Sequence, residues 1–203
     1  MKYLVLAVLL FSMVSCASNV ERIGNYSNPQ KVLLVIDMQI DYIDENGKLP
    51  IEICQINNLV TSVNNIIDDF DKNNNKIIYL RRIFSKNDFR NRSNNYAVVE
   101  GTSGLEIDPR IKIISNFIFD KYAPSSFTNS DFENFLIENQ INELHLCGVM
   151  ADECVYETAL DAFNKGYIVN YYANAVGSSK IKNIEKAIKK LNKKGINIIG
   201  GIQ

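Results

Sequence analysis

An aspartate, a lysine and a cysteine, which together can catalyse hydrolysis, each follow a different apolar segment of this 203-residue chain. Asp37 ends the first apolar run, Lys121 follows the third, and Cys154 lies in the first turn of a predicted helix. A cysteine in such a turn meets the positive end of the helix dipole and free backbone N–H groups, and a nearby lysine lowers the thiol pKa further. The three residues predict a cysteine nucleophile with a carboxylate base, and a buried structural cysteine is the alternative.

Strand and helix patterns alternate along the chain, which predicts a parallel sheet covered by helices. The expected strands are residues 31–37, 76–84, 111–119, 143–147, 167–172 and 196–199. The expected helices are about residues 51–73, 130–139, 152–166 and 180–195. We therefore predict an α/β fold, with a doubly wound, mainly parallel six-stranded sheet and helices on both faces. Ligands bind beyond the carboxyl ends of the strands in such sheets, where the three residues fall.

Two local signals add detail to this fold. Ser130 and Glu133 match a capping box that opens the second helix. The polar, glycine-containing residues 85–110 predict a long loop, and loops of this length are often lids or binding loops.

Composition limits the classes of partner. The formal net charge is -1, and the lysine-rich stretch at 186–194 lies on an amphipathic helix, so nothing predicts a nucleic-acid partner. Hydrophobic residues make up 46% of the chain, which supports one domain with its own core. We expect a small-molecule substrate, and assembly into a homo-oligomer stays open.

Three ordered motifs carry a family resemblance. The segments VLLVIDMQIDY, FDKYAPSSF and LCGVMADECVYETALDAFNKGY resemble the three signatures of the isochorismatase-like cysteine hydrolases. That family includes nicotinamidases, carbamoylsarcosine amidohydrolases, and ureidoacrylate and biuret hydrolases. Residues 101–107 also resemble its Gly-Thr-x-Gly segment, and the resemblance extends from Lys31 to Ile199. It implies an isochorismatase-like three-layer sandwich.

The resemblance also implies a site and a reaction. Asp37, Lys121 and Cys154 match the catalytic triad of the family, and the backbone N–H groups of Met150 and Cys154 match its oxyanion hole. The family places a cis peptide bond at Val149–Met150. The implied reaction is hydrolysis of a small amide, ureide or related C–N bond through a Cys154 thioester. No cofactor is implied.

One feature departs from the nicotinamidase pattern. Nicotinamidases carry a metal through an Asp-x-His segment and a further histidine after the second strand, whereas residues 81–89 of this chain contain no histidine. His145, the one histidine of the chain, lies inside a predicted strand and is interpreted as structural. We therefore predict no metal site built from histidines, and a site built from carboxylates stays open.

Polar residues near the triad have two interpretations each. Gln39 and Asp41 follow Asp37 and either bind the substrate or complete the turn. The arginines 81, 82 and 90 either bind a substrate carboxylate or are solvated surface charges.

Two competing functions share the fold. A true isochorismatase cleaves a vinyl ether without a nucleophilic cysteine, so Cys154 argues against that activity. A non-catalytic envelope binding protein would not need the complete set of Asp37, Lys121 and Cys154. The sequence does not identify the substrate, because the side chains that shape the pocket come largely from loops.

The first twenty residues differ in composition from the rest of the chain. Lys2, an apolar run and small residues predict a signal peptide over 1–16 of the lipoprotein type, with Cys16 as the lipidated residue. Residues 17–30 are expected to be a tether and residues 31–203 the hydrolase domain. This predicts an envelope protein whose membrane contact is the lipid anchor, and a secreted or periplasmic protein is the alternative. A Cys147–Cys154 disulfide would then be conceivable, although the two residues lie on different elements.

Overall fold

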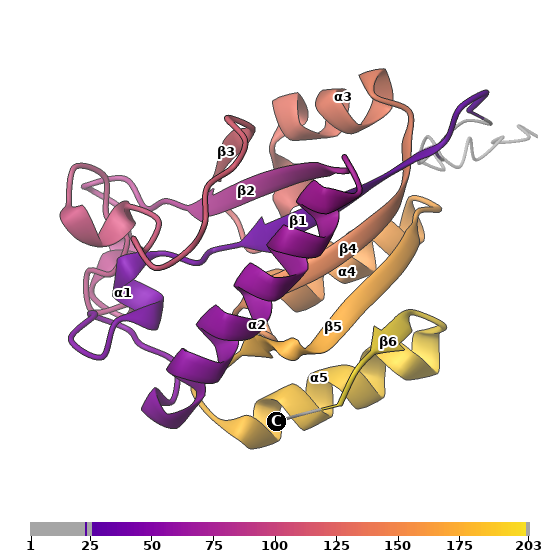
Figure 1. The fold of residues 1–203 in the computed structure, drawn as a ribbon. Helices are drawn as coiled ribbons and strands as arrows, with labels where there is room; N and C mark the ends of the chain where they lie inside the picture. Colours follow the sequence, from indigo (N-terminus) through magenta and orange to yellow (C-terminus); the bar gives the residue numbers. More distant parts are fainter. Residues whose placement is uncertain (1–22, 24–25, 202–203) are drawn as a thin grey trace, which may run out of the picture.

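Six strands form one sheet (Figure 1). The computed structural model describes residue 23 and residues 26–201, so the predicted signal peptide and Cys16 lie outside the described residues. The strands are β1 (Gln30–Ile36), β2 (Lys76–Arg82), β3 (Ile118–Lys121), β4 (Ile141–Val149), β5 (Ile168–Gly177) and β6 (Asn197–Ile199). Their order is β3-β2-β1-β4-β5-β6, and every pairing is parallel. The predicted doubly wound parallel sheet is confirmed.

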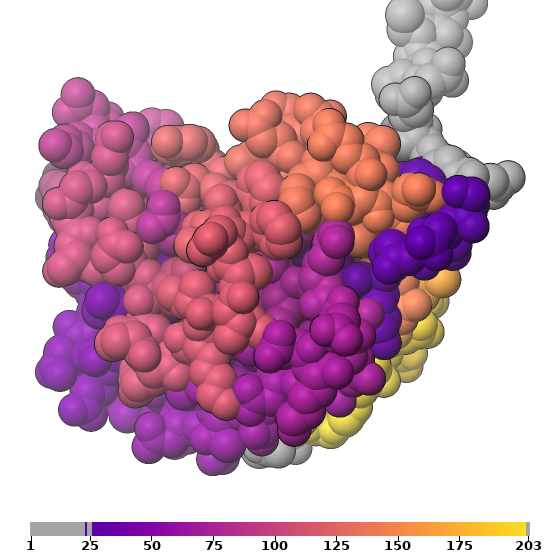
Figure 2. Space-filling view, turned by 45° about the horizontal axis from the view of Figure 1, so that its top comes forward, coloured from indigo at the N-terminus to yellow at the C-terminus, as the bar shows by residue number. Residues whose placement is uncertain are grey.

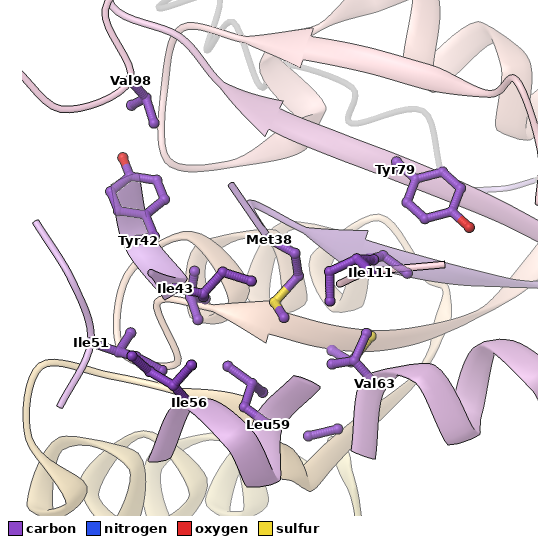
Figure 3. Packing of buried hydrophobic residues seen from close by; sticks show 14 of the residues in the cluster. Met38, Tyr42, Ile43, Ile51, Ile56, Leu59, Val63, Tyr79, Val98 and Ile111 are labelled. Carbon is purple, nitrogen blue, oxygen red and sulfur yellow. The ribbon is translucent and has the colours of Figure 1, made fainter. Parts of the chain in front are cut away.

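Helices cover both faces of the sheet. They are α1 (Ile40–Ile43), α2 (Ile53–Lys72), α3 (Ser130–Glu138), α4 (Cys154–Asn164) and α5 (Ile181–Lys194). One face packs against α2, and the other packs against α3, α4 and α5. The α2 residues Ile56, Leu59 and Val63 recur at helical spacing, and Figure 3 shows these side chains pointing toward Met38.

The part of β1 from Val32 to Ile36 is apolar at every position, and its packing shows why. Leu33 and Val35 belong to the core on the α2 face, whereas Leu34 and Ile36 belong to the core on the opposite face. Alternate side chains of a strand point to opposite faces, so a strand buried on both sides reads as a continuous apolar run.

The same two-sided packing separates two cysteines. Cys147 of β4 packs in the core on the α2 face, whereas Cys154 packs on the other face. Both are free cysteines, so the disulfide that the sequence left open does not form.

The strand order reverses between β1 and β4, which creates the switch point where such sheets bind ligands. These two strands approach closely at Gly148, whose φ is 115°. A Cβ atom there would lie 2.0 Å from the carbonyl oxygen of Ile36. Beyond the carboxyl ends of the strands lie α1 and the long segment that follows β2 (Figure 1).

This long segment is more than a polar loop. It contains two short turns of 3-10 helix, η1 (Phe89–Asn91) and η2 (Ser103–Leu105), and it buries Ala97 and Val98. In Figure 3 the Tyr42 side chain of α1 points toward Val98. Figure 2 shows the segment, in magenta to pink, covering much of one face of the molecule.

Three local predictions were wrong. The third strand is Ile118–Lys121 rather than residues 111–119, because side chains take the N–H groups of the preceding stretch; Lys112 donates to Asn64 Oδ1 at 2.9 Å. The cap of α3 is Asn129 rather than Ser130, since the Asn129 side chain accepts N–H groups of the first turn. The short helix α1 was not predicted, because four residues show no periodicity.

Part of the predicted tether packs against the domain. The Ile23 N–H donates to the carbonyl of Lys165 at 3.1 Å, and the Asn28 N–H donates to Gln140 Oε1 at 3.1 Å. Gln30 already belongs to β1. Among the described residues, no helix has the length and apolar character needed to cross a bilayer.

Candidate active site

Asp37 and Lys121 form a buried ion pair at the carboxyl edge of the sheet. Asp37 follows β1 with a φ of 53°, a conformation that is uncommon for residues other than glycine. Lys121 ends β3, and its Nζ donates to Asp37 Oδ2 at 2.8 Å. Each residue is 1% exposed. Asp37 Oδ1 has no hydrogen-bond partner in the described part of the chain, so this oxygen can accept a proton.

Cys154 begins α4, directly after the turn that leaves β4. The peptide bond Val149–Met150 in this turn is cis, as expected. Within residues 26–201, neither the Met150 N–H nor the Cys154 N–H donates a hydrogen bond to the protein. The Met150 carbonyl, in contrast, accepts the Val155 N–H at 3.1 Å. Two backbone donors near the thiol are therefore available for an oxyanion.

Burial changes the acid–base properties of both reactive groups. Burial, followed by the negative charge of Asp37, raises the pKa of the Cys154 thiol to about 12, although Lys121 opposes both effects. The expectation of a lowered thiol pKa was therefore wrong, because burial outweighs the lysine. Burial also raises the pKa of Asp37, while the charges of Lys121 and Arg82 lower it. Burial therefore favours the neutral form of the thiol, and the neighbouring Asp37 can take its proton.

Asp37, Met150 and Cys154 line a cavity of about 310 Å³. This volume suits a small organic molecule. The other lining residues come from α1, the end of β2, η1 and several loops, and they are Tyr42, Leu49, Pro50, Arg82, Phe84, Arg90, Asn94, Pro124, Asp152, Glu153 and Ser179. Sequence reasoning missed most of these residues. Tyr42 had a signal, since it lies in the same motif as Asp37, but loop residues such as Asn94 and Ser179 had none.

Gln39 and Asp41 hold the backbone and do not line the cavity. The Gln39 amide accepts the Arg82 N–H at 2.8 Å and donates to the Arg82 carbonyl at 2.9 Å and the Leu105 carbonyl at 2.8 Å. Asp41 Oδ2 accepts the Val98 N–H at 2.8 Å. These contacts correct the suggestion that the two residues bind substrate, because their polar atoms are already engaged by the backbone.

The Gly-Thr-x-Gly segment, residues 101–104, packs against the Asp41 carboxylate. A Cβ atom on Gly104 would lie 2.0 Å from Asp41 Oδ2, so a side chain at that position would displace the aspartate. The segment therefore helps to hold the loops around the cavity and contributes no lining residue.

The three arginines that were singled out have different environments. Arg81 Nε pairs with Asp120 at 2.8 Å, outside the cavity, and Arg90 Nη2 pairs with Asp88 at 2.5 Å. Arg82 is 4% exposed and lines the cavity. The interpretation as a solvated charge is therefore wrong for Arg82, because this residue is buried.

The residues after β2 do not fit a metal ion. The part of the chain that the structure describes holds no group of three His, Cys, Asp or Glu side chains placed to bind one. In this region Arg82 and Arg90 line the cavity instead, and their positive charges disfavour a cation. His145 lies elsewhere, where its Nε2 contacts Glu143 Oε1 at 2.7 Å and its ring packs edge-on against Phe70. These contacts support its structural interpretation.

Comparisons with known proteins give a consistent match. The sequence matches the Isochorismatase domain model over residues 31–203. The uncharacterized isochorismatase family protein PncA of Bacillus subtilis is 45% identical over 62 residues, which are 30% of this chain and 34% of that protein.

Two solved structures resemble the fold closely. The nicotinamidase PncA from Bacillus subtilis has a TM-score of 0.76 at 28% identity, covering 84% of this chain and 100% of the other. The pyrazinamidase of Pyrococcus horikoshii, solved in complex with zinc, has a TM-score of 0.70 at 29% identity, covering 84% of this chain and 99% of the other.

Proposed function

The chain belongs to the isochorismatase family of hydrolases, and we propose that it cleaves a small amide or ureide C–N bond with Cys154 as nucleophile. The observation that supports this most is the grouping of the Cys154 thiol with the buried Asp37–Lys121 pair beside a cavity. A buried ion pair is weak evidence for stability, because desolvation offsets its attraction. Its position next to a thiol favours a chemical role.

In the first half of the proposed reaction, a thioester forms. Asp37 takes the thiol proton as the Cys154 sulfur attacks the substrate carbonyl. The N–H groups of Met150 and Cys154 stabilise the oxyanion, and one such donor contributes roughly 100- to 1000-fold to turnover. Asp37 then gives its proton to the leaving nitrogen, so ammonia or an amine departs and an acyl-Cys154 remains.

In the second half, water cleaves the thioester. Asp37, again a carboxylate, removes a proton from the attacking water, and the same two N–H groups hold the second oxyanion. The Cys154 thiolate leaves and takes the proton back. Lys121 keeps the buried Asp37 charged between steps, because its ammonium group offsets part of the desolvation cost.

The test is ammonia release by the full-length chain from nicotinamide, carbamoyl amines, ureides and small amides. Cys154→Ala should lower turnover on an accepted substrate by on the order of 10⁴-fold or more. Cys54→Ala is the matched control, because Cys54 is exposed and should keep wild-type activity. Mass spectrometry after rapid acid quench should find the acyl group on the peptide that contains Cys154. Wild-type turnover by Cys154→Ala would contradict the mechanism.

A further inference from the structure

The Arg82 guanidinium is buried and has no hydrogen-bond or ion-pair partner among the described residues. Its Nη1 has no hydrogen-bond partner, and no ion pair of the described residues includes Arg82. Burying a charge without a partner is costly, so proteins pair such groups with an anion or a hydrogen-bond acceptor. The position of Arg82 in the cavity wall indicates that the missing partner comes from a bound molecule.

The surrounding residues hold this side chain in place. Gln39 bonds to both the N–H and the carbonyl of Arg82, which fixes its backbone. The guanidinium carbon lies 4.4 Å from the centre of the Phe84 ring, and that of Arg90 lies 5.0 Å from the same ring. An arginine that is already ordered loses less entropy when it binds an anion.

The acidic residues of the cavity do not supply the partner. Asp37 is engaged by Lys121, and Asp152 accepts the Ser178 hydroxyl at 2.5 Å. Glu153 is exposed, and no ion pair of the described residues includes it. None of these three carboxylates therefore forms an ion pair with Arg82, which lines the same cavity as Cys154.

We propose that the substrate carries a carboxylate in addition to the scissile amide, and that Arg82 binds this carboxylate. This inference rests on the proposed function, since it names the substrate class of the same site. The planar guanidinium matches a carboxylate with two parallel N–H···O bonds. Arg90 adds a second positive charge at the cavity wall, although it also pairs with Asp88. The substrate class is an ω-amic acid, a short acid with an amide at its other end.

The experiment uses the full-length protein and compares how fast it hydrolyses amides that differ only in whether they carry a carboxylate. The acids oxamate, malonamate, succinamate and glutaramate are each paired with the corresponding neutral diamide, corrected for its two amide groups. The readout is the ratio of kcat/KM for acid over diamide. Charge-assisted hydrogen bonds predict a ratio of about 10 to 100 for at least one chain length. Arg82→Met should bring that ratio close to one.

Two further variants separate recognition from folding. Arg81→Met is the matched control, because Arg81 neighbours Arg82 but pairs with Asp120 outside the cavity, so its ratio should stay at the wild-type value. Arg82→Lys keeps the positive charge but lacks the two parallel N–H donors of the guanidinium, so its ratio should fall between those of wild type and Arg82→Met. If Arg82→Met does not fold, Arg82→Lys decides the question.

The outcomes distinguish the two proposals. A wild-type ratio near one, or a ratio unchanged by the Arg82 variants, overturns the carboxylate site and leaves the hydrolase proposal standing. If no amide is cleaved, the proposed function is contradicted. Calorimetric titration with malonate, succinate and glutarate then tests the site alone. Binding that Arg82→Met weakens 10-fold or more supports it, and absence of binding overturns it.

Discussion

In the proposed reaction Asp37 can act as a base only while it is charged, and burial makes that charge costly. Burial raises the pKa of Asp37 above the ordinary value of 3.8, whereas Lys121, and to a smaller extent Arg82, lowers it. The net direction is upward. The proposed reaction needs the carboxylate in the free enzyme, so kcat/KM should fall as the pH drops through this raised pKa.

The acid limb of the pH profile is therefore a testable property of Asp37. We expect its midpoint above 3.8, and we expect Arg82→Met to move it upward, because the variant loses a positive charge that favours the carboxylate. Measuring kcat/KM against pH checks both, on a neutral amide so that substrate binding through Arg82 does not interfere. Arg81→Met should leave the midpoint in place. A midpoint at or below 3.8, or one insensitive to Arg82, would rule out this role for Asp37.

At the scale of elements, the site depends on how closely β1 and β4 approach. The residue after β1 supplies the carboxylate, and the turn after β4 supplies the thiol and the free N–H groups. Gly148 allows this approach because the Ile36 carbonyl oxygen occupies the place of a Cβ. Both the positive φ of Gly148 and the lack of space exclude a side chain there.

Gly148→Ala should therefore destabilise the protein by about 2 kcal/mol or more, through overpacking and an unfavourable φ. Urea denaturation followed by circular dichroism measures the change in the free energy of unfolding. Gly201→Ala serves as the control, because a Cβ there meets no atom within 4 Å. Equal free energies of unfolding for the two variants would show that β1 and β4 can move apart at Gly148 without loss of stability.

At the scale of the whole molecule, the chain enters the sheet at the end opposite the cavity. Gln30 begins β1 and Asp37 follows its last residue, which places them about 20 Å apart along the strand. If residue 16 is anchored in a membrane, this arrangement lets the cavity face away from the bilayer. The anchor itself is a proposal from the sequence of residues 1–16.

Cell fractionation tests the anchor. Wild-type protein should sediment with membranes at the size expected after signal-peptide removal, because the lipid chains of a bacterial lipoprotein together bind membranes stably. Cys16→Ser should remain unlipidated, which mass spectrometry of the purified protein detects. Recovery of the wild-type chain as a soluble cytoplasmic protein that still begins at Met1 would refute the anchor.

The main strands and helices, and the positions of Asp37 and Cys154 at their ends, could be predicted from the sequence alone. The run Val32–Ile36 is apolar at every position, and the apolar positions of α2 recur at helical spacing, so both elements were recognisable locally. Asp37 and Cys154 were located because each directly follows or begins such an element. These patterns involve only residues that are close in sequence, so they can be recognised without the tertiary structure.

The tertiary structure alone decided the strand order, the direction of the thiol pKa shift and the lack of an ion-pair partner for Arg82 among the described residues. Each depends on groups far apart in sequence: Lys121 meets Asp37 across 84 positions, and Gln39 reaches Arg82 across 43. Burial sets the cost of a charge, and burial follows from the packing of all elements together. For this reason Cys154 has a raised rather than a lowered pKa. For the same reason the sequence cannot distinguish Arg82 from Arg81 and Arg90, whereas in the structure Arg82 lines the cavity and forms no ion pair with the described residues.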